Sequence, residues 1–125
     1  MAHEQLMKAG MQAYIDTFNR GDAAGIAALY SDDATVEDPV GSPLKKGKAE
    51  IAAFYQMAVA TGAKLKLVAP IRASHGNSAA MAFDVELNMP QGHAVIRVID
   101  VMTFNEAGKF TSMRAFWGPS DMQML

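Results

Sequence analysis

The chain contains 125 residues, half of them hydrophobic, carries a formal net charge of −2 and has no cysteine. Its length suits one domain with a core of its own, and we expect residues 1–125 to form that single domain. The basic residues are scattered, which argues against nucleic acid as a partner because its phosphates need a concentrated basic surface. The lack of cysteine excludes disulfides, thiolate metal sites and cysteine nucleophiles.

The N-terminal residues show no charged-then-apolar secretory pattern, and no apolar run is long enough to cross a bilayer. We therefore expect a cytoplasmic protein with no membrane partner. The hydrophobic share is slightly rich for a soluble chain of this size, which indicates an apolar cavity, a subunit interface, or both.

Three helices are expected in the first half of the chain. The first spans residues 4–20, and its apolar residues share one face: Met7, Met11, Tyr14, Ile15 and Phe18. Gly21 ends this helix, and Asp22 is placed to cap a second helix over residues 23–30. The third helix spans residues 49–60, with an apolar face made of Ile51, Phe54, Tyr55 and Val59.

Between the second and third helices we expect a polar turn at 31–33, a strand over 34–38 and a loop over 42–48. From residue 64 onward the hydrophobic pattern changes to the period of two that is typical of strands. Turn-forming segments divide this half into four strands: 64–74, 79–89, 94–104 and 110–117. Helices first and antiparallel strands second predict an α+β fold, with the helices packed on one face of the sheet.

Asp38 ends the first expected strand, directly before Pro39. Alternation places Asp38 on the same face as the apolar Val36, and Glu37 on the opposite face, where it can meet water. Pro39 has no backbone N–H and ends the strand, so rigid backbone would hold this carboxylate in place, as a catalytic base requires. The alternative is structural, because Asp before Pro is also a common way to open a turn.

Asp100 interrupts an apolar strand: both its chain neighbours and the residues two positions away are apolar. An ionised aspartate in such a place is costly unless it is paired. Burial can instead raise the pKa of this carboxyl until it stays protonated, and the neutral acid is then a hydrogen-bond donor. The alternative is an ion pair with Arg97 or Arg114, and the sequence leaves the two possibilities open.

These residues together carry a family resemblance. The run Asp32-Asp33-Ala34-Thr35-Val36-Glu37-Asp38-Pro39, combined with the separated Tyr14, Tyr30, Tyr55 and Asp100, closely resembles bacterial ketosteroid isomerase (steroid Δ5-3-oxo isomerase). The resemblance extends from about Met11 to Gly118. It implies a homodimer with the cone-shaped fold of the nuclear transport factor 2-like superfamily. In that fold a curved antiparallel sheet and three N-terminal helices enclose a conical apolar cavity.

The resemblance implies a steroid isomerase that needs no cofactor and no metal and moves the double bond of 3-oxo-Δ5 steroids into conjugation. Asp38 corresponds to the general base, and Tyr14 with protonated Asp100 corresponds to the oxyanion hole that donates hydrogen bonds to the dienolate oxygen. Tyr55 corresponds to a donor to Tyr14, and Tyr30 extends this chain of hydroxyls. Further residues correspond to positions that line the steroid cavity: Trp117, Phe54, Met81, Phe83 and Met113.

Other activities on the same architecture are alternatives. A dehydratase, epoxide hydrolase or polyketide cyclase would need a His–Asp pair or a water-holding polar network inside the cavity. A non-catalytic small-molecule-binding module would have no reason to bury several acids and phenols together. The histidines fall in the tail and in turns, so we expect all three at the surface: His3, His75 and His93.

Overall fold

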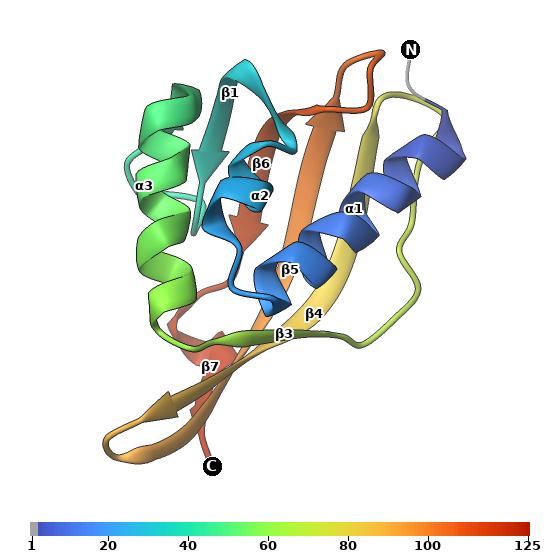
Figure 1. Ribbon diagram of the computed structural model, residues 1–125. Coiled ribbons are helices and arrows are strands. Elements are labelled where there is room, and N and C mark those ends of the chain that lie inside the picture. The colour runs from blue at the N-terminus through green and yellow to red at the C-terminus, as the bar shows by residue number, and fades with distance from the viewer. Residues whose placement is uncertain (1–2) are drawn as a thin grey trace.

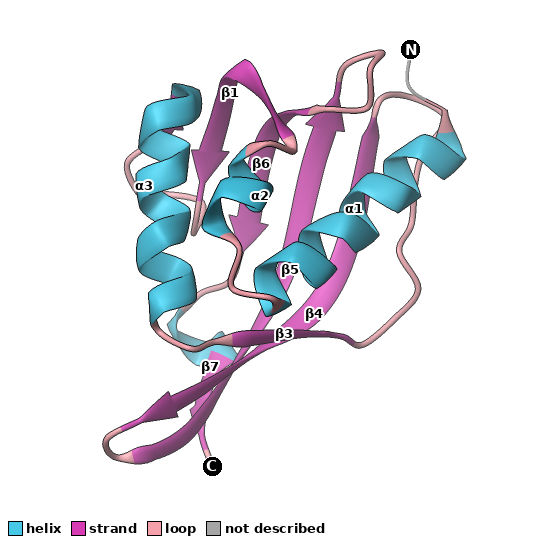
Figure 2. Ribbon diagram, in the orientation of Figure 1, coloured by secondary structure: helices cyan, strands magenta, loops and turns pink. Residues whose placement is uncertain are grey.

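The computed structural model describes residues 3–125, which form three α-helices, a seven-stranded sheet and a short 3-10 helix. The strand order is β2-β1-β6-β5-β4-β3, and β7 pairs with β5 beside this path. The three helices lie on one face of the curved sheet (Figure 1), and the colouring in Figure 2 separates the two layers. The elements are α1 (Glu4–Asn19), α2 (Ala23–Ala27), β1 (Tyr30–Glu37), β2 (Lys45–Lys46), α3 (Gly47–Ala60), β3 (Lys64–Leu67), β4 (Ser78–Met89), β5 (Gly92–Phe104), β6 (Phe110–Phe116), η1 (Pro119–Asp121) and β7 (Met122–Met124).

The first and third helices confirm the expected apolar faces. All five residues predicted for the α1 face are buried, and Ile51 and Tyr55 are buried on α3. Asp22 caps α2 as expected, because its Oδ1 accepts a hydrogen bond from the Gly25 N–H at 2.9 Å. The helices therefore present Tyr14 and Tyr55 to the sheet from two sides.

The stretch after α2 differs from the prediction. The helix ends at Ala27 rather than Tyr30, and the expected polar turn at 31–33 is part of β1. Tyr30 pairs with Phe110 of β6, so sheet pairing overrides the local helical and turn preferences here. β2 pairs with β1 only at Thr35 and Val36, so residues 31–33 lie at an open edge of the sheet. This exposed position accounts for their polar, turn-like composition.

The sheet is mixed rather than wholly antiparallel, because β1 and β6 run parallel, with Glu37 opposite Arg114. Two further boundaries were predicted wrongly. The expected strand 64–74 ends at Leu67, and Pro70, which cannot donate to a ladder, follows in an irregular segment that rejoins the sheet by a single Arg72–Ala80 bridge. The expected loop 42–48 contains β2 and the start of α3, and β7 in the C-terminal tail was not predicted.

The long antiparallel pair β4 and β5 forms the centre of the sheet, and its inner face is layered. Met81 lies opposite Asp100, Phe83 opposite Val98, and Val85 opposite Ile96. Met113 of β6 lies opposite Met102, one layer further from the open end. The layer in which a side chain lies therefore determines how far it is from the open end of the inner face.

The outer face of the sheet is covered by none of the three α-helices (Figure 1). It is polar at one end, where Thr103 Oγ1 lies 2.6 Å from Ser112 Oγ, and apolar at the other, where Ile99 and Phe116 are exposed. Within residues 3–125, none of the helices combines the length and apolar character that crossing a bilayer requires.

Candidate active site

A cavity of about 210 Å³ opens between the helices and the inner face of the sheet. Its walls come from α1, α3, β3, β4 and β5, together with two residues that directly follow strands, Asp38 and Trp117. The walls are mostly apolar, and the polar groups that reach them are few: Asp38, Asp100, Tyr14, Tyr55 and Thr61. Convergent polar groups in an apolar hollow are typical of a ligand site.

Asp38 stands where β1 ends, on the cavity side of the strand, as the alternation predicted. The Trp117 Nε1–H donates a hydrogen bond to Asp38 Oδ1 at 3.0 Å. Burial raises the pKa of the Asp38 carboxyl above its ordinary value, and the bond from Trp117 opposes this by stabilising the carboxylate. Asp38 therefore has one oriented oxygen and one oxygen available to a ligand, which suits a base.

Glu37 lies on the outer face, as the alternation predicted, and both of its carboxylate oxygens are bonded there. Its Oε1 accepts a hydrogen bond from Arg114 Nε at 3.2 Å, and its Oε2 accepts one from the Gly41 N–H at 3.0 Å. These two bonds lower the pKa of Glu37, the one from Gly41 most. The residue before the candidate base is thus an anion fixed at both oxygens.

Asp100 lies at the floor of the cavity with 1% of its surface exposed. Neither carboxyl oxygen has a hydrogen-bond partner among residues 3–125. Burial raises the pKa of this carboxyl well above its ordinary value, and the charge of Asp38 raises it further. A buried polar group without a partner is costly and calls for an explanation, and a ligand oxygen in the cavity would provide one.

The alternative of an ion pair at Asp100 is wrong. Arg114 instead pairs with Glu37 on the outer face, and Arg97 donates from Nη1 to Gln123 Oε1 at 3.2 Å. Both arginines point away from the cavity because their positions alternate with those of the inner-face residues on β5 and β6.

Three buried tyrosines form a chain of hydroxyls beside the cavity. Tyr30 Oη lies 2.6 Å from Tyr55 Oη, which lies 3.0 Å from Tyr14 Oη. Burial is the main cause that raises the pKa of all three phenols, so each keeps its proton. When Tyr30 donates to Tyr55 and Tyr55 donates to Tyr14, the Tyr14 proton is free for a ligand. Tyr14 and Tyr55 line the cavity, and Tyr30 lies behind them.

The predicted lining residues divide into two groups. Phe54, Phe83 and Trp117 line the cavity, whereas Met81 and Met113 do not and belong to the closed core. The layered inner face explains Met113, which lies one layer beyond Asp100, while Met81 pairs with Asp100 at the floor and packs into the core beside it. The lining that sequence reasoning missed follows the period of two along β4 and β5: Val85, Leu87, Ile96 and Val98.

No group of three or more His, Asp or Glu within the described part of the chain is arranged to hold a metal ion. The three histidines are exposed, as expected, and none contributes to the cavity: His3, His75 and His93. His3 has a structural contact that was not predicted, because its Nδ1 accepts a hydrogen bond from the Leu6 N–H and caps α1.

Residues 11–113 match the model of the SnoaL-like domain, so the chain belongs to the SnoaL-like family. A steroid Delta-isomerase of Nocardioides simplex is 45% identical over 116 residues, which cover 93% of this chain and 93% of the relative. That similarity confirms the predicted resemblance to the ketosteroid isomerases of the nuclear transport factor 2-like superfamily.

Two further similarities concern epoxide enzymes. The solved structure of SalBIII, described as an epoxide hydrolase/cyclase-like enzyme in pyran ring formation in polyether salinomycin, has a TM-score of 0.90 at 29% identity, with 97% of both chains covered. The epoxide hydrolase LasB of Streptomyces lasalocidi is 28% identical over 125 residues, and this chain spans 44% of its length. The structural similarity confirms the predicted α+β fold.

The burial of Asp100 predicts a pH-dependent stability. Its folded pKa lies above the ordinary value of 3.8, so at intermediate pH the folded state keeps a proton that the unfolded state releases. Its contribution to stability is full below that ordinary value and is lost as the pH rises through the folded pKa. Asp100→Asn never ionises and lacks this loss.

Thermal unfolding followed by circular dichroism between about pH 4 and about pH 8 tests this. The melting temperature of Asp100→Asn should rise relative to that of the wild type as the pH increases, by roughly 3–6 °C for each kcal/mol of stability that the wild type loses. Melting curves that shift in parallel across the range would show that Asp100 titrates normally.

Proposed function

We propose that this protein is a steroid Δ-isomerase that moves the double bond of a 3-oxo-Δ5 steroid into conjugation with its ketone. One observation carries the proposal: a single apolar cavity holds a carboxylate oriented by an indole and, on its floor, a second carboxyl that has no partner among residues 3–125. The steroid Delta-isomerase of Nocardioides simplex, 45% identical over nearly the whole chain, supports it.

Asp38 is the proposed general base. Its carboxylate takes a proton from the carbon between the ketone and the double bond, and the electrons move onto the ketone oxygen to form a dienolate. Asp38 then returns the same proton to the far carbon of the former double bond, the dienolate collapses to the conjugated ketone, and the carboxylate is restored. Such a positioned base contributes about 10²- to 10⁴-fold to a rate.

Tyr14 and protonated Asp100 are the proposed donors to the dienolate oxygen. Both groups keep their protons because burial penalises their charged forms, so both can donate where negative charge develops. The apolar surroundings strengthen these bonds relative to water. Tyr55 and Tyr30 orient the Tyr14 hydroxyl through the chain of phenols.

Burial raises the pKa of both aspartates, but much more at Asp100 than at Asp38, as this chemistry requires. Asp100 has 1% exposure and no partner within the described residues, so its neutral form is favoured. Asp38 is only partly buried and accepts the Trp117 N–H, which favours its ionised form. The charge on Asp38 also holds the proton on Asp100 more firmly. Each acid thus supports the protonation state of the other.

The size of the cavity fits the reactive end of a steroid. Its volume of about 210 Å³ lies below the about 300–1,000 Å³ typical of sites that enclose a drug-sized ligand. Phe54, Phe83 and Trp117 supply flat apolar walls for a fused ring. We infer that the ketone ring enters toward Asp100 while the opposite end of the steroid remains at the mouth.

A second candidate is epoxide opening, favoured by the similarity to SalBIII and LasB. A carboxylate and a carboxylic acid in one cavity can also act as base and acid on an epoxide. Turnover of a polyether-type epoxide precursor, with none of a 3-oxo-Δ5 steroid, would favour this candidate.

We also propose that the protein is a homodimer joined through the outer face of the sheet. Ile99 is 50% exposed there, Phe116 40% and Val68 55%, on the side that the helices leave open. Contiguous exposed apolar side chains on a soluble domain mark a surface that another chain covers. The resemblance to ketosteroid isomerase implies the same assembly.

The primary test of the isomerase proposal is the ultraviolet absorbance of the conjugated enone when purified protein meets 5-androstene-3,17-dione. Asp38→Asn should lower kcat by roughly 10²- to 10⁴-fold while steroid binding is retained, because the amide cannot take the proton. Trp117 still contacts the amide in this variant, so the cavity keeps its shape. Wild-type turnover in Asp38→Asn would show that another group is the base.

The donor role of Asp100 predicts a graded response in the same assay. Asp100→Leu removes the donor and should lower kcat by about 10²- to 10³-fold. Asp100→Asn keeps an N–H donor and should lose at least about tenfold less. Equal losses in the two variants would leave Asp100 with a packing role only.

The dimer proposal predicts a mass of twice 13.4 kDa in sedimentation equilibrium. Ile99→Asp places a charge in the proposed interface and should shift the equilibrium toward the monomer. Met57→Asp introduces the same charge at an exposed apolar residue of α3, on the helical side of the sheet, and is the control that should leave the mass unchanged. A monomeric wild type at micromolar concentration would refute the assembly.

A further inference from the structure

We propose that the ion pair between Glu37 and Arg114 positions the catalytic base from the side of the sheet opposite the cavity, by fixing the register between Asp38 and Trp117. The inference deepens the proposed function, since it assigns positioning residues to the same site. Neither Glu37 nor Arg114 lines the cavity, so neither is a catalytic residue.

The pair joins the two strands that carry the base and its hydrogen-bond donor. Glu37 and Arg114 are partners in the parallel β1–β6 register, and Glu37 immediately precedes Asp38 in the chain. Arg114 lies on β6 and precedes Trp117, which directly follows that strand, by three residues. A slip between the two strands therefore displaces the Trp117 N–H from the Asp38 carboxylate.

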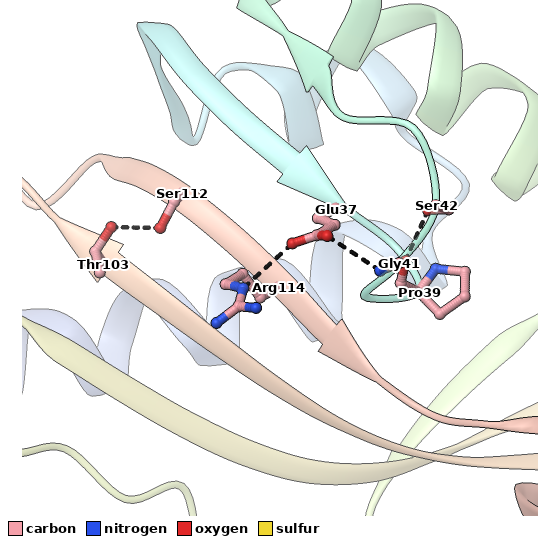
Figure 3. Close-up of polar contacts among 7 residues, drawn as sticks. All are labelled: Glu37, Pro39, Gly41, Ser42, Thr103, Ser112 and Arg114. Atoms are coloured by element: carbon pink, nitrogen blue, oxygen red, sulfur yellow. Dashed lines mark hydrogen bonds and ion pairs between the residues drawn. The ribbon is translucent and has the colours of Figure 1, made fainter.

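The second oxygen of Glu37 holds the turn after the base. Figure 3 shows Glu37 between Arg114 and the Gly41 N–H, one bond at each carboxylate oxygen. The turn also closes on itself, because the Ser42 N–H and Oγ both donate to the Pro39 carbonyl, at 2.9 Å and 2.7 Å. Glu37 thus links β6 to the turn on the far side of Asp38.

Backbone bonds complete the same junction. The Val40 N–H donates to the Ala115 carbonyl at 2.8 Å, so the turn after the base is also tied to β6 next to Arg114. The chain is thus anchored to β6 before Asp38, at Glu37, and after it, at Val40.

Stability does not explain this pair. The Arg114 side chain is 52% exposed, and exposed ion pairs contribute little to folding because water screens them. Its guanidinium also lies 5.2 Å from the centre of the Phe116 ring, which fixes its direction. An exposed pair with fixed geometry, next to the base, is better suited to positioning than to stabilisation.

The chain offers a direct probe of this geometry, because Trp117 is its only tryptophan. Its indole emission responds to the protonation of the carboxyl that it contacts, so the emission measured against pH titrates Asp38 in the free protein. Asp100 and Tyr14 face Asp38 across the cavity, and Glu37 and Arg114 flank it on the other side; the variants change only the latter two.

The test uses Glu37→Gln, Arg114→Met and the double variant. The amide of Gln can accept only one of the two bonds, and Met keeps the apolar stem beside Phe116. We expect the emission midpoint to move to higher pH in all three variants, because a loosened Trp117 bond stabilises the carboxylate less. With a 3-oxo-Δ5 steroid, kcat should fall by roughly tenfold, with KM changed by less than about twofold. The double variant should match the single variants, because the two residues act as a unit.

Glu4→Gln removes the carboxylate of the distant Glu4–Lys8 pair and is the matched control, expected to behave as the wild type. A purely electrostatic role predicts the opposite sign in Glu37→Gln, since loss of a nearby anion lowers the pKa of Asp38. A midpoint that falls or stays constant in Glu37→Gln overturns the proposal. So does a loss of activity matched by a lower melting temperature or by dissociation of the dimer. An inactive wild type would refute the isomerase function, while the emission test still decides the role of the pair.

Discussion

The burial of one carboxyl without a protein partner is the constraint on which the rest of the site depends. Asp100 sits in the central strand of the sheet, between apolar neighbours on both sides. Such a group reduces stability, and the surrounding core of methionines and aromatic residues must offset that cost. The same burial makes the group useful, because a neutral acid can donate where an ionised one cannot.

The two faces of the sheet carry different groups of residues around Asp100. The inner face carries the floor and walls of the cavity, and the outer face carries the Glu37–Arg114 pair and the exposed apolar residues. Asp38 connects the two faces: its side chain lies in the cavity, and the preceding Glu37 is bonded to Arg114 on the outer face. The period-two alternation of β1 is sufficient to produce this division.

The sequence predicted the features that depend on local periodicity. The helical faces, the alternating strands and the cavity-side position of Asp38 follow from spacing within a few residues, whereas spacing left the environment of Asp100 open and only the family resemblance indicated its role. Contacts between distant strands were beyond that reasoning: the parallel β1–β6 pairing, the pairing of β7 with β5, and the role of Arg114. Met113 was misplaced for the same reason, because depth in the cavity depends on cross-strand register and not on face.

The layered inner face has an evolutionary consequence. The acid at the floor is separated from the mouth by the successive layers of Phe83 with Val98 and Val85 with Ile96. Substitutions in the outermost layer can alter which molecule fits without disturbing the proton chemistry beneath it. Divergence of the ligand can therefore proceed while the acid–base centre stays constant, in keeping with the many activities that one fold can host.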